Sequence, residues 1–151
     1  MKSTGDKLQD QFIPFKESKI LEKLGFDMDC FGYYENQDKK LIISYNSHPN
    51  IPEKHKHLPA LYTSNNRNSN SPQWLIAAPT YQQAFEWFEI EHSMFITRRI
   101  DTTPNEILGF DYTIKSFRFA PKIVEFEKPY DEFDRNISRL TCLRKLISII
   151  K

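Results

Sequence analysis

Glycine and cysteine are scarce in this chain, and the placement of each argues against a class of functional site. The four glycines, at positions 5, 25, 32 and 109, never cluster, so no glycine-rich loop is present to cradle a nucleotide phosphate. The two cysteines, Cys30 and Cys142, are far apart in the chain and lack the close spacing of a zinc site. We therefore expect a reduced, intracellular protein in which both cysteines are buried as small hydrophobic residues.

A net charge of one sign and long apolar runs are also missing. Basic and acidic side chains nearly cancel, at 21 against 20, so the totals carry no signature of a nucleic-acid or anionic-membrane partner. No apolar run approaches the ~18 residues of a membrane span, and the polar N-terminal segment 1–12 is expected to be frayed. These absences predict a soluble, cytoplasmic protein with no membrane partner.

Aromatic residues are abundant, at 14% of the 151 residues, and predict one packed domain spanning 1–151. The most informative stretch is a helix that begins after Pro79, where Thr80 and Gln83 have the spacing of a capping box. The helix is expected to end near His92, and four of its residues share one apolar face. This predicted core ridge consists of Tyr81, Ala84, Phe85 and Phe88.

Two further helices are predicted from apolar periodicity. A short one is expected over Phe15–Leu24, and Gly25 follows it where a left-handed residue commonly ends a helix. The last one runs from about Asp131 to residue 151. Its apolar face is predicted to consist of Phe133, Ile137, Leu140, Leu143, Ile147 and Ile150.

The strands are predicted as two hairpins. The first spans residues 30–45, and the second spans 94–114, with 122–127 as a short edge strand. The predicted fold is therefore α+β, with an antiparallel sheet of about four to five strands covered by two main helices, plus the short N-terminal helix.

A long polar loop, residues 46–73, separates the two halves of the chain. Structureless connections of this length are commonly either functional or disordered, and the run from Thr63 to Pro72 has the polar composition of disorder. Because loop closure depends weakly on length, deletion of residues 63–71 is predicted to leave the melting temperature nearly unchanged.

Two groups of residues resemble metal ligands, and both have a simpler interpretation. Residues 48–57 contain three histidines and one glutamate, but prolines and lysines are interleaved with them, which favours a solvated loop. Glu89 and His92 have the Glu-x-x-His spacing of di-iron bundles, yet such sites need a second copy. No catalytic, cofactor-binding or metal-binding residue is therefore predicted.

The second hairpin carries the strongest functional cluster in the sequence. Basic residues near aromatic ones are typical of single-stranded nucleic-acid binding. The candidates here are Arg98, Arg99, Lys115, Arg118 and Lys122. Acidic residues on the same elements favour a salt-bridged sheet surface, so binding to mixed-sequence DNA or RNA is predicted to be no tighter than about 10⁻⁴ to 10⁻⁶ M.

Three stretches of the chain resemble one known group of proteins. They are CFGYY at 30–34, APTYQQAFEWF at 78–88 and LTCLRKLI at 140–147. The chain is similar over most of its length to an uncharacterised group of small proteins common in tailed phages and prophages of gut Bacteroides-type bacteria. The resemblance implies a phage or mobile-element setting in the bacterial host cytoplasm, and no known activity.

Three hypotheses for function follow from the sequence. The leading one is a small non-enzymatic accessory protein of phage or mobile-element origin that binds a protein partner. The alternative is a nucleic-acid-binding module that uses the second hairpin. The third is a metal-dependent or hydrolytic enzyme.

Overall fold

The computed structural model describes residues 8–43, 67–116, 122–125 and 135–151 of the chain. The first residues of the predicted frayed N-terminus and most of the polar loop lie outside the described residues. The chain, predicted as one domain, divides into two compact units, residues 1–80 and 81–151. We describe each unit by itself.

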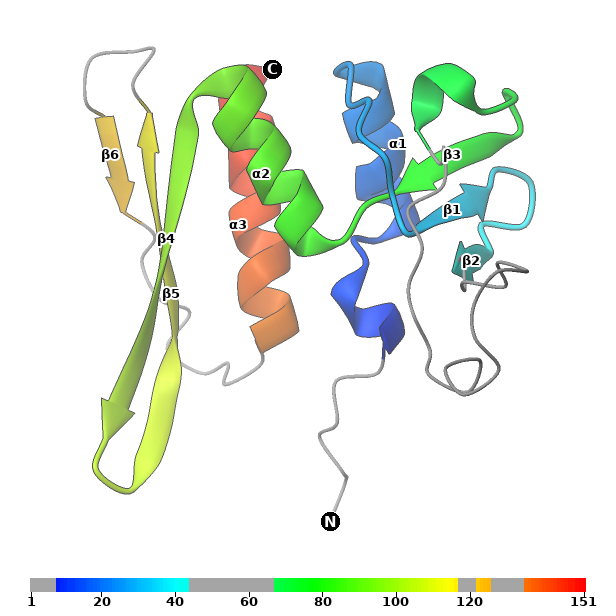
Figure 1. Cartoon of the computed structure of the whole chain (residues 1–151). Helices are drawn as coiled ribbons and strands as arrows, with labels where there is room; N and C mark the ends of the chain where they lie inside the picture. The colour runs from blue at the N-terminus through cyan, green and yellow to red at the C-terminus, as the bar shows by residue number, and fades with distance from the viewer. Residues whose placement is uncertain (1–7, 44–66, 117–121, 126–134) are drawn as a thin grey trace, which may run out of the picture. The chain divides into compact units, whose positions relative to one another are not determined.

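Unit 1 is a small antiparallel sheet with a helix packed against it. The strand order is β2-β1-β3, and α1 lies against β3 (Figure 1). Its elements are the 3₁₀ turn η1 (Leu8–Gln11), α1 (Phe15–Lys23), β1 (Gly32–Glu35), β2 (Leu41–Ile43), the 3₁₀ turn η3 (Asn68–Asn70) and β3 (Leu75–Ala78).

The core of unit 1 forms where β1 and β3 face the N-terminal segment. Phe12, Tyr34, Ile76 and Ala78 are buried together, and the Tyr34 hydroxyl donates a 2.7 Å hydrogen bond to the Ile13 carbonyl. Tyr34 and Ile76 are directly paired across the two strands, so their side chains share one face of the sheet. This pairing explains why an aromatic strand and a distant apolar run form one core.

Backbone requirements account for two of the glycines. Gly25 has φ of 93° immediately after Leu24, the C-cap residue of α1, and this confirms the predicted left-handed position. A Cβ atom on Gly32 would lie 2.6 Å from the Ile42 carbonyl oxygen. Only glycine therefore permits the close approach of β1 to β2.

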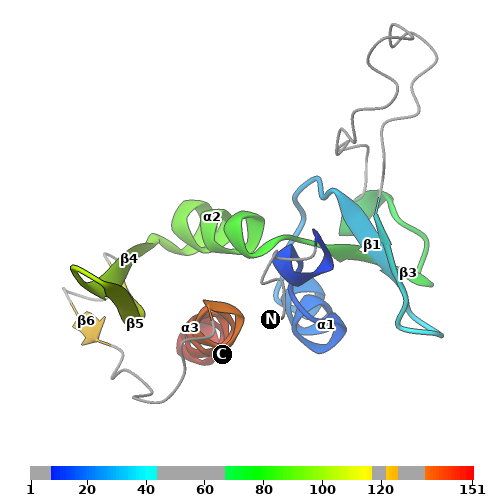
Figure 2. The same ribbon diagram turned by 90° about the horizontal axis from the view of Figure 1, so that it is seen from below.

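Unit 2 is a long hairpin with two helices packed on it. The order β4-β5-β6 is antiparallel, with β6 at the edge as predicted, and a register shift falls between Asp101 and Thr102. Figure 2 shows α2 and α3 beside each other, and α2 contacts β4 while α3 contacts β5. Its elements are α2 (Tyr81–His92), β4 (Met94–Thr103), β5 (Glu106–Ser116), β6 (Lys122–Glu125) and α3 (Arg135–Ile150).

The predicted core ridge of α2 lies on the inner side of this helix. Tyr81, Ala84 and Phe88 are buried, and Trp87 is buried beside them. Phe85 is half-buried, and its ring lies 6.0 Å from the ring of Tyr112 on β5. The buried face of α2 is thus wider than the predicted ridge of four residues, because it also includes Trp87.

The buried face of α3 differs from the predicted one. Ile137, predicted to be buried, is 39% exposed, and that prediction is wrong. The buried residues of this face are Arg139, Cys142, Leu143, Leu146 and Ile147, of which Leu143 and Ile147 were predicted. Arg139 occupies the first of these positions because its guanidinium carbon lies 4.6 Å from the Tyr81 ring centroid, a cation–π contact that spacing rules for apolar residues do not include.

The α+β class is confirmed, and one feature of the predicted architecture is corrected. The described strands form two three-stranded sheets, whereas a single sheet was predicted. The added strand is β3, an apolar run of four residues whose partner β1 is distant in sequence, so no local hairpin signal marks it. In the described ranges no helix is long and apolar enough to cross a membrane.

Candidate functional site

The structure distributes the four described positions of the basic cluster predicted for the second hairpin over two faces. Arg98 is paired with Tyr112, and the next residue, Arg99, is paired with Asp111. Neighbouring positions of a strand belong to opposite faces, so position 99 shares a face with the exposed Lys115 and position 98 shares the other with Lys122. Arg118 lies outside the described residues. The four described positions therefore do not form one basic face.

Both cysteines lie in apolar surroundings that keep their thiols protonated. Burial raises the pKa of Cys30 far above its usual range, and the thiol donates a 3.4 Å hydrogen bond to the Met28 carbonyl. Burial also raises the pKa of Cys142 to about 12. A cysteine nucleophile needs the thiolate form, so at neutral pH both residues act as packing groups.

The metal-type ligands of the sequence do not assemble within the described residues. In that part of the chain, no group of three or more histidine, cysteine, aspartate or glutamate side chains is placed to hold a metal ion. His92 instead packs its ring 4.7 Å from the Trp87 ring. The histidines of 48–57 lie outside the described residues.

A basic surface does form on unit 1. Lys16, Lys19 and Lys23 lie at i, i+3 and i+7 in α1, a spacing that places them along one side of a helix. The helix buries Leu21 and its neighbours on the other side. Lys39 and Lys40 follow on the exposed turn between β1 and β2. We call these five residues the lysine surface.

The Phe15 ring joins the helical and turn parts of the lysine surface. The ammonium nitrogens of Lys19 and Lys39 each lie 5.9 Å from the centre of this ring, within the range of a cation–π contact. The Phe15 ring also makes an edge contact with the Tyr34 ring, and the two ring centres lie 5.6 Å apart. Two ammonium groups from distant parts of the sequence are thereby held at one aromatic side chain.

Lys39 adopts a backbone conformation that residues other than glycine rarely take. Its φ is 55°, in the left-handed region that costs an L-residue about 1–2 kcal/mol. The turn fixes this conformation through two hydrogen bonds, from Lys39 N to the Glu35 carbonyl at 2.8 Å and from Glu35 N to the Lys40 carbonyl at 3.0 Å. Glycine or asparagine is the usual residue at such a position.

Asn36 connects the lysine surface to an exposed tryptophan. Its side-chain oxygen accepts a 3.3 Å hydrogen bond from the Lys19 ammonium. Its backbone amide donates a 2.8 Å hydrogen bond to the backbone carbonyl of Trp74. The Trp74 side chain is 61% exposed. The surface therefore continues from lysines to a large aromatic group.

The lysine surface carries a modest excess of positive charge. Glu22, Glu35 and Asp38 lie in the same segments, so the five ammonium groups exceed the carboxylates by two, not counting the buried Glu17. No carboxylate within the described ranges forms an ion pair with any of the five lysines.

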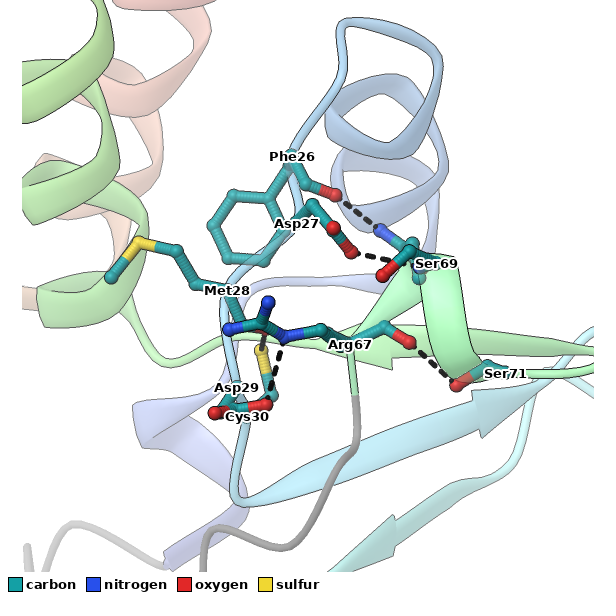
Figure 3. A network of polar contacts seen from close by, with 9 residues as sticks. Phe26, Asp27, Met28, Asp29, Cys30, Arg67, Ser69 and Ser71 are labelled. Carbon is teal, nitrogen blue, oxygen red and sulfur yellow. Dashed lines mark hydrogen bonds and ion pairs between the residues drawn. The ribbon is translucent and has the colours of Figure 1, made fainter.

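A second polar network holds the end of the long loop against the segment before β1 (Figure 3). Arg67 forms a 3.0 Å ion pair with Asp29, and the Ser69 amide donates to the Asp27 carboxylate at 2.8 Å. The backbone and side-chain hydrogen bonds from Ser69 hold the pKa of Asp27 below its usual value. Asn68 donates to the Phe26 carbonyl at 2.8 Å. We call residues 67–71 with their partners 26–29 the clasp.

The clasp corrects the expectation of disorder for residues 67–71, and with it the prediction that deletion of residues 63–71 leaves the melting temperature nearly unchanged. The side-chain oxygen of Asn68 accepts a 2.9 Å hydrogen bond from the Ala77 amide, which lies on the edge of β3. The clasp therefore satisfies a strand edge that would otherwise face solvent. Polar composition did not reveal this, because one asparagine supplies both a donor and an acceptor to backbone groups far away in sequence.

We expect Asn68→Ala to lower the free energy of unfolding by about 1–3 kcal/mol, because it removes the side-chain hydrogen bonds to the Phe26 carbonyl and from the Ala77 amide. Urea denaturation of the variant against the wild-type protein measures the loss. Gln73→Ala, at an exposed neighbouring position, is the control and should change stability by less than about 0.5 kcal/mol. Equal stability of Asn68→Ala and the wild type would contradict a structural role for the clasp.

Comparisons with protein-family models, with curated proteins and with solved structures found no match to this chain. The resemblance to phage proteins therefore stays a prediction, and the argument for function rests on the geometry of the lysine surface.

Sequence reasoning missed the lysine surface for an identifiable reason. The helical spacing of Lys16, Lys19 and Lys23 is visible in the sequence, but the balanced charge of residues 1–75, with ten basic and nine acidic side chains, conceals it. The turn lysines join the helix only because β1 folds against α1 through Tyr34 and Phe15. A helical projection of charge, residue by residue, would have found the first half of the site.

Proposed function

We propose that this protein is a non-enzymatic nucleic-acid-binding protein whose lysine surface holds the phosphate backbone. Ammonium groups recognise phosphates as point charges, and phosphate contacts supply the sequence-independent part of nucleic-acid affinity. The five lysines lack carboxylate partners among the described residues, so an incoming phosphate would not have to displace an internal ion pair. This proposal moves the nucleic-acid hypothesis from the second hairpin to unit 1.

The observation that carries the proposal is the left-handed backbone of Lys39. A residue held in an unfavourable conformation costs free energy that folding alone does not require, and such outliers concentrate at functional positions. Glycine at position 39 would fit the turn without that cost. The lysine side chain, placed at the Phe15 ring beside Lys19, is the feature that glycine would not provide.

The charge excess sets the scale of the expected affinity. An excess of two positive charges supports roughly two to three effective phosphate contacts, and each contact adds about −0.7 to the slope of log K against log salt for a single strand. Such a surface is expected to bind with a Kd of about 10⁻⁶ M at physiological salt, the tight end of the non-specific range.

Lys39→Gly tests the proposal without disturbing the fold. Relief of about 1–2 kcal/mol of backbone cost offsets the lost ring contact, about 0.5–1 kcal/mol, and the extra chain entropy of glycine, about 0.5–1 kcal/mol. The melting temperature should therefore stay nearly constant. Fluorescence anisotropy with a labelled oligonucleotide should show affinity about fivefold weaker at 0.1 M salt, the value of one phosphate contact.

Two matched variants separate the lysine surface from other basic positions. Lys145→Gln removes one exposed charge from α3, and Lys115→Gln removes one from β5 in the second hairpin. Neither variant should change the affinity for nucleic acid by more than about twofold, because in this proposal neither residue contacts the phosphate backbone of the nucleic acid. A fivefold loss of affinity in Lys115→Gln, with no loss in Lys39→Gly, would show that the binding site is on the second hairpin and not on the lysine surface.

A protein partner in a phage or mobile-element setting is the second candidate. The observation that favours it is the exposure of Ile90 on α2 and Ile137 on α3, since exposed apolar side chains can mark protein interaction sites. A pull-down from bacterial lysate with and without nuclease treatment distinguishes the two functions. Capture of one protein that survives nuclease and is lost in Ile90→Ser would favour the second candidate.

A further inference from the structure

The two tryptophans of this chain occupy opposite environments. Trp87 is 4% exposed and packs edge-on against Phe88 at 4.9 Å, whereas Trp74 is 61% exposed. Single exposed hydrophobic residues are common on protein surfaces. What distinguishes Trp74 is that its carbonyl accepts a hydrogen bond from Asn36, the residue whose side chain contacts Lys19 of the lysine surface.

The backbone of Trp74 is fixed on both sides. The Asn36 amide donates to the Trp74 carbonyl at 2.8 Å, and the following residue, Leu75, donates its amide to the Pro72 carbonyl at 2.9 Å. The indole is therefore carried by an ordered turn. Because this backbone is already ordered, contact with a ligand costs the entropy of the side chain only.

The same hydrogen bonds place Trp74 next to the groups proposed to hold phosphates. Asn36 binds the Trp74 carbonyl through its amide and the Lys19 ammonium through its side-chain oxygen. One residue thus links the backbone of Trp74 to a cationic side chain. Alternation of stacking platforms with backbone-binding cations is the arrangement used to bind single-stranded nucleic acids.

We propose that Trp74 stacks on an unpaired base, so that the lysine surface prefers single-stranded over double-stranded nucleic acid. This inference rests on the proposed function. The bases of a duplex are paired and stacked on one another, so their faces are closed to the indole, while the phosphates of both forms remain accessible. Trp74 therefore contributes to binding a single strand only, and the lysines contribute to both forms.

Two measurements on the full-length chain test this inference. A mixed-sequence single-stranded oligonucleotide and its duplex are each titrated by anisotropy, and intrinsic tryptophan fluorescence is followed in parallel. We expect the single strand to quench the fluorescence and to bind more tightly than the duplex. Trp74→Ala should abolish the quenching and weaken single-strand binding by about 5- to 100-fold, the range for one stacked base, while duplex affinity stays constant.

The outcomes separate this inference from the proposed function. Salt-dependent binding to both forms with equal affinity, and no effect of Trp74→Ala, would overturn the stacking role and leave the phosphate-binding role intact. No binding to either form would overturn both. Trp74→Phe, which keeps an aromatic face, should retain part of the single-strand preference, and a melting temperature equal to that of the wild type excludes misfolding as the cause of a loss.

Discussion

Phe88→Ala is expected to lower the free energy of unfolding by about 3–5 kcal/mol, the range for truncation of a buried phenylalanine. Phe88 is fully buried in α2, and its ring contacts the rings of Trp87 at 4.9 Å and His92 at 5.7 Å. Removal of the ring leaves a cavity among groups that are held by one another and cannot collapse fully. Urea denaturation followed by circular dichroism measures the loss.

Variants at two other positions of α2 provide comparisons for the stability loss of Phe88→Ala. Glu86→Ala, at an exposed position, should change stability by less than about 0.5 kcal/mol. Phe85→Ala should fall between the two, since Phe85 is half-buried and water already reaches part of its ring. Equal losses for Phe88→Ala and Glu86→Ala would show that the buried face of α2 is assigned incorrectly.

The largest expected effect on binding comes from removing three charges of the lysine surface together. The variant Lys19→Gln, Lys39→Gly, Lys40→Gln should bind a single-stranded oligonucleotide about 100-fold more weakly at 0.1 M salt, because each lost phosphate contact is worth about fivefold. Lys19 and Lys39 meet at the Phe15 ring, and Lys40 is adjacent on the exposed turn. Anisotropy titration measures the change.

A control variant removes the same number of charges from unit 2. Lys115, Lys145 and Lys151 are all exposed, and their replacement by glutamine lowers the net charge of the protein as much as the first variant does. If net charge alone governed binding, both triple variants would lose affinity equally. A loss confined to the first variant identifies the lysine surface as the contact region.

Local patterns were sufficient to predict the elements whose signals are contained in a few consecutive residues. The helix from Tyr81 to His92 begins and ends where the predicted cap at Thr80 and the apolar spacing placed it. The left-handed Gly25 and the edge position of β6 were likewise predicted. In each case the physical cause, a cap, a chain reversal or alternating charge, acts within one element.

Features that depend on distant residues were beyond local patterns. The strand Leu75–Ala78 exists because β1 supplies its hydrogen-bond partners, and Asn68 is ordered because Phe26 and Ala77 offer it backbone groups. The lysine surface has the same character, since Lys39 reaches Lys19 only through Phe15. Polar and charged contacts of this kind have no period in the sequence, so only the folded chain shows them.

The salt dependence of single-strand binding tests the central claim most directly. Affinity is measured by anisotropy for the wild type and for Lys39→Gly over a series of salt concentrations. We predict a slope of log K against log salt of about −2 for the wild type, the value of about three phosphate contacts, and a slope shallower by about 0.7 for Lys39→Gly. Binding weaker than about 10⁻⁴ M, or a slope that Lys39→Gly leaves unchanged, would contradict the assignment of the lysine surface as a phosphate-binding site.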